Sequence, residues 1–447
     1  MKKIYLILPL LILLLIILIT ACNILMTPTE KADEAANEAV QQDAVTVDEA
    51  AETEIATETA PSVDMSAYVE SHGFPVPHGT QAESEAVLPL DASEEDSGIK
   101  TDFKTESLSF LAVGDNLIHS SVYTDGNIAA NGEGYKFDHM YENLAETIRN
   151  ADLSFINQES PIAGDEFAYS SYPMFNTPSQ MGDTLVNLGF DIISIANNHM
   201  LDKYEKGYMN HINFWSDKPV TLVGGYKDEA DYNTIRVIEK NGISIAMLAY
   251  TYGTNGMSLP SDSKMVVPFI KDSEITRQIA MAKEKADLVF VSIHWGDENS
   301  FSPNSEQRRL AQLMADNGVD VILGHHSHTI QPIEWLDRPD GGKTLVAYSL
   351  SNFMSAQEYP RNMLAGMLTF NIEQIDDTEC YITDVLFTPT VTYYNNSWRQ
   401  FKLYFLKDYT QEIHNTARFS RFEPDYHYYY DKLKSTISSE FLPDYIK

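Results

Sequence analysis

The chain has 447 residues and a formal net charge of −34, with 65 acidic residues against 31 Lys and Arg. This balance argues against nucleic-acid binding, because phosphate recognition requires clustered Lys and Arg. The length is ample for a large hydrophobic core.

Residues 1–22 have the pattern of a targeting signal. Two lysines precede an unbroken apolar stretch at 4–19, and small residues lead to Cys22. Residues 19–22, Ile-Thr-Ala-Cys, resemble a bacterial lipobox, in which the cysteine is lipidated and becomes the mature N-terminus. The alternative is an uncleaved anchor helix, although the apolar run is shorter than a span of ~20 residues. Both interpretations place the rest of the chain outside the cytoplasm. The lipobox resemblance implies the extracytoplasmic face of a bacterial plasma membrane. Lipidation of Cys22 would also leave Cys380 without a disulfide partner in the chain.

Residues 23–106 differ in composition from the rest of the chain. They hold 20 acidic residues and 3 lysines, so half of the net charge of −34 lies here. Such a segment cannot bury enough apolar surface to offset chain entropy, and its like charges extend it. We expect a disordered tether that holds a folded domain away from the membrane. The alternative is an acidic tail that binds a basic partner.

Strands and helices are expected to alternate through a folded domain at 107–394. Apolar runs predict strands at 107–113, 151–156, 190–196, 287–293, 319–323, 344–350 and 381–391. Helical spacing and end signals predict helices at 137–150, 177–188, 207–215, 273–285 and 304–317. This order predicts a mainly parallel core with antiparallel additions and helices on its faces.

Local signals sharpen three of these elements. Thr177-Pro-Ser-Gln180 looks like a capping box, and Asn304 with Gln307 forms a second one. Asn241-Gly242 predicts a hairpin between 235–239 and 243–249. The aromatic segment 395–447 is expected to be a packed appendage of one or two helices.

Polar side chains follow five of the predicted strands. They are Asp115, Asn157 with Glu159, Asn198 with His199, His294, and finally His325, His326 and His328. Oxygen and imidazole ligands without a thiolate suit Mn, Fe or Zn, and an ion of this kind serves hydrolysis by polarising a phosphoryl group. Each residue alone also fits a turn, a helix cap or a core histidine. Their convergence at one sheet edge would favour a site for one or two divalent ions.

The motifs as a series resemble those of the CapA family of capsule or poly-γ-glutamate synthesis proteins. This family is a branch of the calcineurin-like metallophosphatase superfamily. The motifs are Val113-Gly-Asp115, Asn157-Gln-Glu159-Ser-Pro161, Ala196-Asn-Asn-His199 with Asp202, His294-Trp-Gly-Asp-Glu298, Gly324-His-His-Ser-His328 and Ser349-Leu-Ser-Asn-Phe353. The resemblance covers about 108–370 and implies an α/β fold, a four-layer α/β/β/α sandwich with the site at one edge.

The resemblance also implies roles for single residues. Matches to the superfamily's metal ligands are Asp115, Asn198, His294, His326 and His328, with Glu159 in the place of the bridging aspartate. His199 matches the histidine that contacts the phosphoryl group or protonates the leaving group. Contact with substrate or support of the ligands is expected for Asn157, Asp202, Glu298, His325 and Asn352.

Three positions depart from these patterns. Leu117 stands where the superfamily has a ligand histidine, and Glu159 is longer than the usual aspartate. Ser351 replaces the glycine that is usual in the CapA branch. With one ligand missing, a single metal ion is as plausible as a pair.

The resemblance implies a role in making, exporting or anchoring an anionic surface polymer, above all poly-γ-glutamate. The expected partners are that polymer, the membrane through the lipid anchor, and membrane-bound components of the polymer synthase. One alternative is an active metal-dependent hydrolase, such as a phosphoesterase, with another substrate. The other is a non-catalytic module that binds the polymer.

Overall fold

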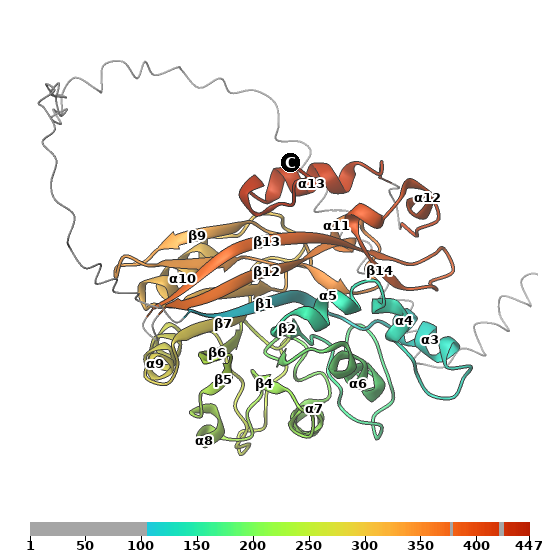
Figure 1. Cartoon of the computed structure of the whole chain (residues 1–447). Coiled ribbons are helices and arrows are strands. Elements are labelled where there is room, and N and C mark those ends of the chain that lie inside the picture. The colour runs from blue at the N-terminus through green and yellow to red at the C-terminus, as the bar shows by residue number, and fades with distance from the viewer. Residues whose placement is uncertain (1–104, 376–378, 420–423) are drawn as a thin grey trace, which may run out of the picture. The chain divides into compact units, whose positions relative to one another are not determined.

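Two β-sheets form the centre of the structure, a computed structural model that describes residues 105–375, 379–419 and 424–447 (Figure 1). The expected signal segment with Cys22, and the expected tether as far as residue 104, lie outside these residues. In spatial order, the first sheet contains β14 (Lys402–Phe405), β13 (Glu379–Tyr393), β12 (Leu364–Ile375), β1 (Thr105–Asn116), β2 (Leu153–Asn157), β3 (Ile192–Ser194) and β4 (Thr221–Val223), with β11 (Asn352–Met354) paired to β1. The second contains β5 (Arg236–Lys240), β6 (Ile243–Thr251), β7 (Leu288–His294), β8 (Val321–His325), β10 (Lys343–Ala347) and β9 (Ile333–Asp337).

Both sheets combine parallel and antiparallel pairs. Strands β1 to β4 are parallel neighbours, whereas β12, β13 and β14 are antiparallel additions. In the second sheet β6, β7, β8 and β10 are parallel, and β5 and β9 form antiparallel edges. This arrangement agrees with the predicted parallel core, whose crossovers require helices.

The inner faces of the sheets share one hydrophobic core. The Phe110 ring of β1 lies 5.2 Å from that of Phe290 in β7 and 5.1 Å from that of Phe370 in β12. The Ser292 hydroxyl donates to the Ser194 hydroxyl across the two sheets at 2.9 Å. These contacts hold the sheets face to face, so their strand ends reach the same edge of the molecule.

Helices cover the outer faces. They are α3 (Ser120–Ala129), α4 (Asp138–Tyr141), α5 (Ala145–Asn150), α6 (Ser179–Leu188), α7 (Tyr204–Ser216), α8 (Glu229–Tyr232), α9 (Asp272–Lys283), α10 (Ser305–Asp316), α11 (Pro360–Met363), α12 (Gln411–His414) and α13 (Tyr428–Thr436), with short 3₁₀ turns at Leu406–Asp408 and Ser439–Phe441. A second core joins α9 and α10 to the second sheet through Ile279, Met314 and Val291. Leu144, Leu185 and Ile212 of the α4–α7 group pack into the core of the first sheet. The expected α/β/β/α sandwich is confirmed (Figure 1).

The local predictions were confirmed where residues close together in the sequence determine the structure. The Asn304–Gln307 capping box opens α10, and both of its hydrogen bonds are present. Gly189 ends α6 with a φ of 103°. Asn241 and Gly242 form the predicted hairpin turn, with φ values of 51° and 83°.

Two local predictions were wrong because distant residues intervene. The helix expected at 137–150 is broken into α4 and α5, and at the break Asn143 donates to the Leu403 carbonyl of β14 at 2.7 Å. The Thr177 hydroxyl caps no helix, since it donates to the Ser160 hydroxyl at 2.9 Å, and Pro178 occupies the N-cap of α6. Tertiary hydrogen bonds thus override the local helix signals.

The C-terminal segment 395–447 is packed, as expected, and contains α12 and α13. It also contributes β14 to the first sheet, which the sequence did not predict. Tyr409, Tyr429 and Phe441 join the main core. Within the described ranges, no helix has the length and hydrophobicity of a membrane-spanning segment.

Candidate metal centre

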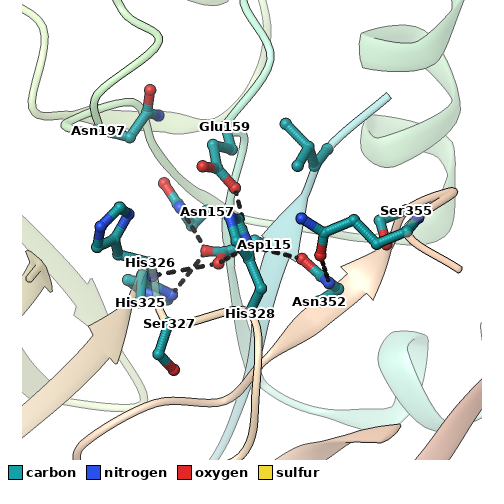
Figure 2. A network of polar contacts seen from close by, with 12 residues as sticks. Asp115, Asn157, Glu159, Asn197, His325, His326, Ser327, His328, Asn352 and Ser355 are labelled. Carbon is teal, nitrogen blue, oxygen red and sulfur yellow. Dashed lines mark hydrogen bonds and ion pairs between the residues drawn. The ribbon is translucent and has the colours of Figure 1, made fainter. Parts of the chain in front are cut away.

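The register of the first sheet brings three candidate residues into one row. Asp115 of β1 pairs with Asn157 of β2 on one side and with Asn352 of β11 on the other. Gly114 makes this possible, because a Cβ there would lie 1.8 Å from the Ser351 carbonyl oxygen. The Asp115 carboxylate is thereby fixed at the centre of the edge (Figure 2).

The second sheet supplies the histidines. His294 at the end of β7 pairs with His325 at the end of β8, and His326 and His328 follow on the next loop. Gly324 allows the close approach of β8 to the chain after β10, since a Cβ would lie 2.0 Å from the Tyr348 carbonyl oxygen. His326 and His328 have φ values of 88° and 54°. A backbone conformation that non-glycine residues avoid is held here at a cost of ~1–3 kcal/mol per residue.

Asp115 is surrounded by donors from both sheets (Figure 2). Its Oδ1 accepts from the Asn157 amide at 2.7 Å, and its Oδ2 accepts from the His326 backbone N–H at 3.2 Å. Nδ1 of His325 lies 3.3 Å from Oδ1, and Nδ1 of His328 lies 3.4 Å from Oδ2. Nδ1 of His328 also lies 2.9 Å from the side-chain oxygen of Asn352.

Glu159 connects the two halves of the site. Its Oε1 lies 3.5 Å from Nε2 of His294, and its Oε2 lies 3.8 Å from Nδ1 of His328. The same Nε2 of His294 lies 2.9 Å from the side-chain oxygen of Asn198. These groups lie at or just after the ends of β2, β3, β7 and β8, so four strand ends meet at the Glu159 carboxylate.

Seven buried side-chain atoms of the site have no hydrogen-bond partner in the described chain. They are Oδ1 of Asn157, both carboxylate oxygens of Glu159, Nδ1 of His294, both ring nitrogens of His325 and Nδ1 of His326. A buried polar atom without a partner costs ~1–3 kcal/mol, and most native proteins avoid it. Their concentration at one point indicates that the site is built for a ligand.

Burial also changes the protonation of these groups. It raises the pKa of Glu159 to about 8 and holds the pKa values of His294 and His326 well below the usual range. Burial alone would lower the pKa of His328, but the carboxylates of Glu159 and Asp115 raise it to about 10. Burial alone would raise the pKa of Asp115, but His325 and His328 hold it well below its usual value. His294 and His326 are therefore neutral at pH 7, the form that binds metal.

Three groups of side chains could each hold a metal ion. Within each group the ligand atoms lie within 4.8 Å of one another: Asp115, Glu159 and His328; Glu159, His294 and His326; and Glu298, His326 and His328. Ligands about 2.0–2.3 Å from a shared ion are separated by such distances. The donor set of carboxylates and imidazoles fits Mn, Fe or Zn. The residues present therefore fit a metal centre.

A histidine–carboxylate pair borders this centre. Nδ1 of His199 lies 2.8 Å from Oδ2 of Asp202, which also accepts from the Phe175 backbone N–H at 2.7 Å. Because Nδ1 of His199 faces Asp202, Nε2 is the ring nitrogen that could exchange a proton with a substrate. The Asn255 side chain links the pair to Asn198, accepting from its amide at 3.2 Å.

The structure brings together all the predicted site residues of the folded domain, whereas Cys22 lies outside the described residues. Residues that the sequence analysis missed follow β6: Asn255, and Tyr252, whose ring centroid lies 4.5 Å from that of His326. The strand-end rule could have found them, since β6 also ends at this edge. His119 was missed as well, and its ring packs on Phe175 at 5.4 Å. Leu117, in place of the superfamily's histidine, is buried.

Comparison with known proteins gives a family match. The family model described as "Bacterial capsule synthesis protein PGA_cap" matches residues 109–357, which include every predicted site residue of the folded domain. The PGA biosynthesis protein CapA of Bacillus subtilis is 28% identical over 250 residues, 53% of this chain and 62% of that protein. The capsule biosynthesis protein CapA of Bacillus anthracis is 25% identical over 311 residues, 68% of this chain and 70% of that protein. The match thus spans less than two thirds of the B. subtilis relative.

Solved structures show a weaker likeness. Haemophilus influenzae NAD nucleotidase is 15% identical with a TM-score of 0.41, over 76% of this chain and 65% of that chain. The calcineurin-like phosphoesterase YfkN of B. subtilis is 13% identical with a TM-score of 0.38, over 64% of this chain and 91% of that chain. Both likenesses are too weak to support an inference about function.

Proposed function

The chain belongs to the family of bacterial capsule synthesis proteins, and from this premise we propose that it acts in the synthesis, export or anchoring of capsular poly-γ-glutamate. The names of both Bacillus relatives support this role. The observation that carries the proposal is the family match over residues 109–357. The buried atoms without hydrogen-bond partners inside that region indicate where a ligand would bind.

The proposed functional site is a metal centre that would hold one or two divalent ions of Mn, Fe or Zn. One position is formed by Asp115, Glu159 and His328, and the other by Glu159, His294, His326 and the side-chain oxygen of Asn198. A bound ion of this class polarises a phosphoryl or carbonyl group and lowers the pKa of a coordinated water. Glu159 belongs to both groups, so its carboxylate could be a ligand of one ion or of two ions.

The second candidate function is metal-dependent hydrolysis of a phosphoester, and the His199–Asp202 pair favours it. Asp202 holds the His199 ring through Nδ1, and Nε2 can exchange a proton with a bound substrate. We expect His199→Ala to retain metal and to lower any hydrolysis by about 10²-fold or more, as for a lost general acid. Equal hydrolysis by this variant and the wild type would exclude His199 from proton transfer.

We also propose that a lipid on Cys22 anchors the protein at the extracytoplasmic face of the plasma membrane. This position would bring the folded domain to the growing polymer and to the membrane-bound components of its synthase. Replacement of Cys22 by Ala should release the protein from the membrane fraction of the cells that make it. Retention of the variant at the membrane, at full length, would contradict lipid anchoring.

The proposed role is tested in the cell that encodes the chain. Deletion of its gene should abolish or shorten the surface poly-γ-glutamate, measured as glutamate released by acid hydrolysis of the purified polymer. The wild-type gene should restore the polymer and His294→Ala should not. Asp297→Asn is the matched control, because this exposed side chain belongs to none of the three metal groups. Unchanged polymer after the deletion would contradict the role.

A further inference from the structure

Glu298 has an unusual position for an exposed acidic residue. It lies on the loop after β7, four residues beyond His294, and its side chain is exposed. A carboxylate oxygen of Glu298 lies within 4.8 Å of ring nitrogens of both His326 and His328. In the described part of the chain, no Lys or Arg forms a salt bridge with it. The carboxylate therefore faces the two histidines, and no Lys or Arg of the described residues pairs with it.

Two hydrogen bonds connect the loop that carries Glu298 to the loop that carries the histidines. The Asn299 backbone N–H donates to the Ser327 carbonyl, between the two histidines, at 2.7 Å. The Thr329 hydroxyl donates to the Ser300 carbonyl at 2.6 Å. These bonds fix the backbone next to Glu298 relative to His326 and His328, so the carboxylate needs little reorganisation to bind with them.

A side chain from a third segment reinforces this connection. The Asn362 amide donates to the side-chain oxygen of Asn299 at 2.9 Å and to the His328 carbonyl at 3.0 Å. It thus bridges the Glu298 loop and the histidine loop. An accidental contact of an exposed glutamate would not require such a framework.

The histidines themselves point to a ligand. His326 is 4% exposed, and its Nδ1 has no hydrogen-bond partner within the described residues. His326 and His328 also hold strained backbone conformations, with φ values of 88° and 54°. Strain that the structure maintains at a cluster of possible ligands indicates a function for their orientation.

We propose that Glu298 is a metal ligand, which joins His326 and His328 from the solvent side of the centre. This inference rests on the proposed metal centre and goes beyond it, because the family resemblance gave Glu298 only a role in contacting substrate or supporting ligands.

The exposed position gives Glu298 a specific consequence for substrate entry. Glu298 is exposed, whereas the inner carboxylates of Asp115 and Glu159 are fully buried. It adds a third negative charge to the ligand set. An anionic substrate group that approached the site from solvent would meet the negative charge of Glu298 before that of the buried carboxylates.

The test measures Mn²⁺ binding by isothermal titration calorimetry with the purified full-length protein, its Glu298→Gln variant and its Asp297→Asn variant. Glu298→Gln keeps the side-chain size and removes the charge. We expect it to weaken Mn²⁺ binding by at least about 10-fold, or to remove one bound ion, because even outer partners of a metal site contribute that much. Asp297→Asn removes the neighbouring charge, which accepts a hydrogen bond from the Asn304 amide. This variant should stay within about 2-fold of the wild-type affinity.

Thermal unfolding of the metal-free proteins gives the second readout. Glu298 is exposed, so Glu298→Gln should unfold at the wild-type temperature without metal and show a smaller rise with Mn²⁺. Wild-type affinity in Glu298→Gln would overturn this inference and leave the inner centre intact. An equal loss in both variants would also overturn it, since it would show a general effect of charge. A wild-type protein that binds no Mn²⁺, Fe²⁺ or Zn²⁺ would overturn the proposed centre together with Glu298.

Discussion

The two edges of the sheets use carboxylates in opposite ways. At the amino edge, an aspartate directly precedes each of four parallel strands, and its carboxylate accepts a backbone N–H from the strand beside it. The pairs are Asp152 with Ser109, Asp191 with Ser154, Asp287 with Ser244, and Asp320 with Val289, all at 2.8–2.9 Å. In the first three pairs the serine hydroxyl donates as well. These carboxylates hold the starts of neighbouring strands together.

The carboxyl edge of the same strands is not satisfied in this way. Both oxygens of Glu159 lack a hydrogen-bond partner in the described structure. His326 and His328 at this edge also have positive φ values. The aspartates of the amino edge instead accept hydrogen bonds from the backbone of a neighbouring strand. The comparison shows that backbone and serine donors saturate the aspartates of the amino edge, whereas the Glu159 carboxylate of the carboxyl edge is left open to a ligand.

Removal of a histidine from the carboxyl edge should have the largest effect. His294→Ala and His326→Ala should each lose most of the bound metal. A ligand bound at several hundred times its Kd contributes about 3–4 kcal/mol to stability, and this contribution would disappear. Elemental analysis and thermal unfolding measure both quantities. His139→Ala, on α4, is the control and should keep the metal; if it behaved like the other two, the loss would not be specific to the site.

Glu159→Gln should separate function from stability. The variant should bind metal poorly, yet without metal it should be more stable than the wild type by about 2 kcal/mol at pH 8, because burial penalises the Glu159 carboxylate more than the nearby His328 stabilises it. Burial raises the pKa of Glu159 from 4.5 to about 8. Between these values the unfolded chain releases a proton that the folded chain retains, so the metal-free wild type loses stability as pH rises.

The advantage of Glu159→Gln should therefore grow from about pH 5 to pH 8 and stay level above it. Urea unfolding of the metal-free proteins across this range measures the difference. A variant that is less stable than the metal-free wild type at every pH would show that Glu159 is a structural carboxylate like those of the amino edge.

At the amino edge, removal of a carboxylate should lower the stability of the protein instead of raising it. Asp191→Ala leaves the buried N–H of Ser154 without its acceptor and should cost about 1–2 kcal/mol, with metal affinity unchanged. Asp191→Asn keeps an acceptor oxygen and should cost less. Denaturant unfolding and metal titration of both variants check this prediction. Weaker metal binding by the Asp191→Ala variant would contradict the view that the carboxylates of the amino edge are only structural.

Relief of backbone strain at the carboxyl edge should have the smallest effect on stability. His326→Gly and His326→Ala both remove the imidazole, but glycine tolerates a φ of 88°. The metal-free glycine variant should therefore be more stable by about 1 kcal/mol. At His294, in the regular strand β7, the same pair of variants should show the reverse order, because glycine weakens a strand. The same order at both positions would contradict strain at His326.

The sequence predicted those features that neighbouring residues decide. The Asn304–Gln307 cap, the Asn241-Gly242 turn and the stop at Gly189 need few other contacts. The site could also be predicted, because strand ends in an α/β sheet share one edge and the ligand types are distinctive. The family motifs made the assignment of single residues possible.

Features that depend on distant partners could not be predicted. Asn143 breaks a helix through a bond to Leu403, 260 residues away. β14 belongs to the first sheet because it pairs in antiparallel fashion with β13. The reach of Glu298 toward His326 depends on hydrogen bonds between two loops. Sequence patterns contain no direct signal for contacts of this kind.

The most direct test of the central claim is the metal content of the purified full-length protein, measured together with its thermal unfolding before and after chelation. The ligand atoms that converge without partners predict one or two divalent transition-metal ions per chain. Removal of the metal should lower the unfolding temperature, and Mn²⁺ or Zn²⁺ should restore it. A protein that is purified without metal, takes up none on addition and unfolds at the same temperature with and without chelator would contradict the account.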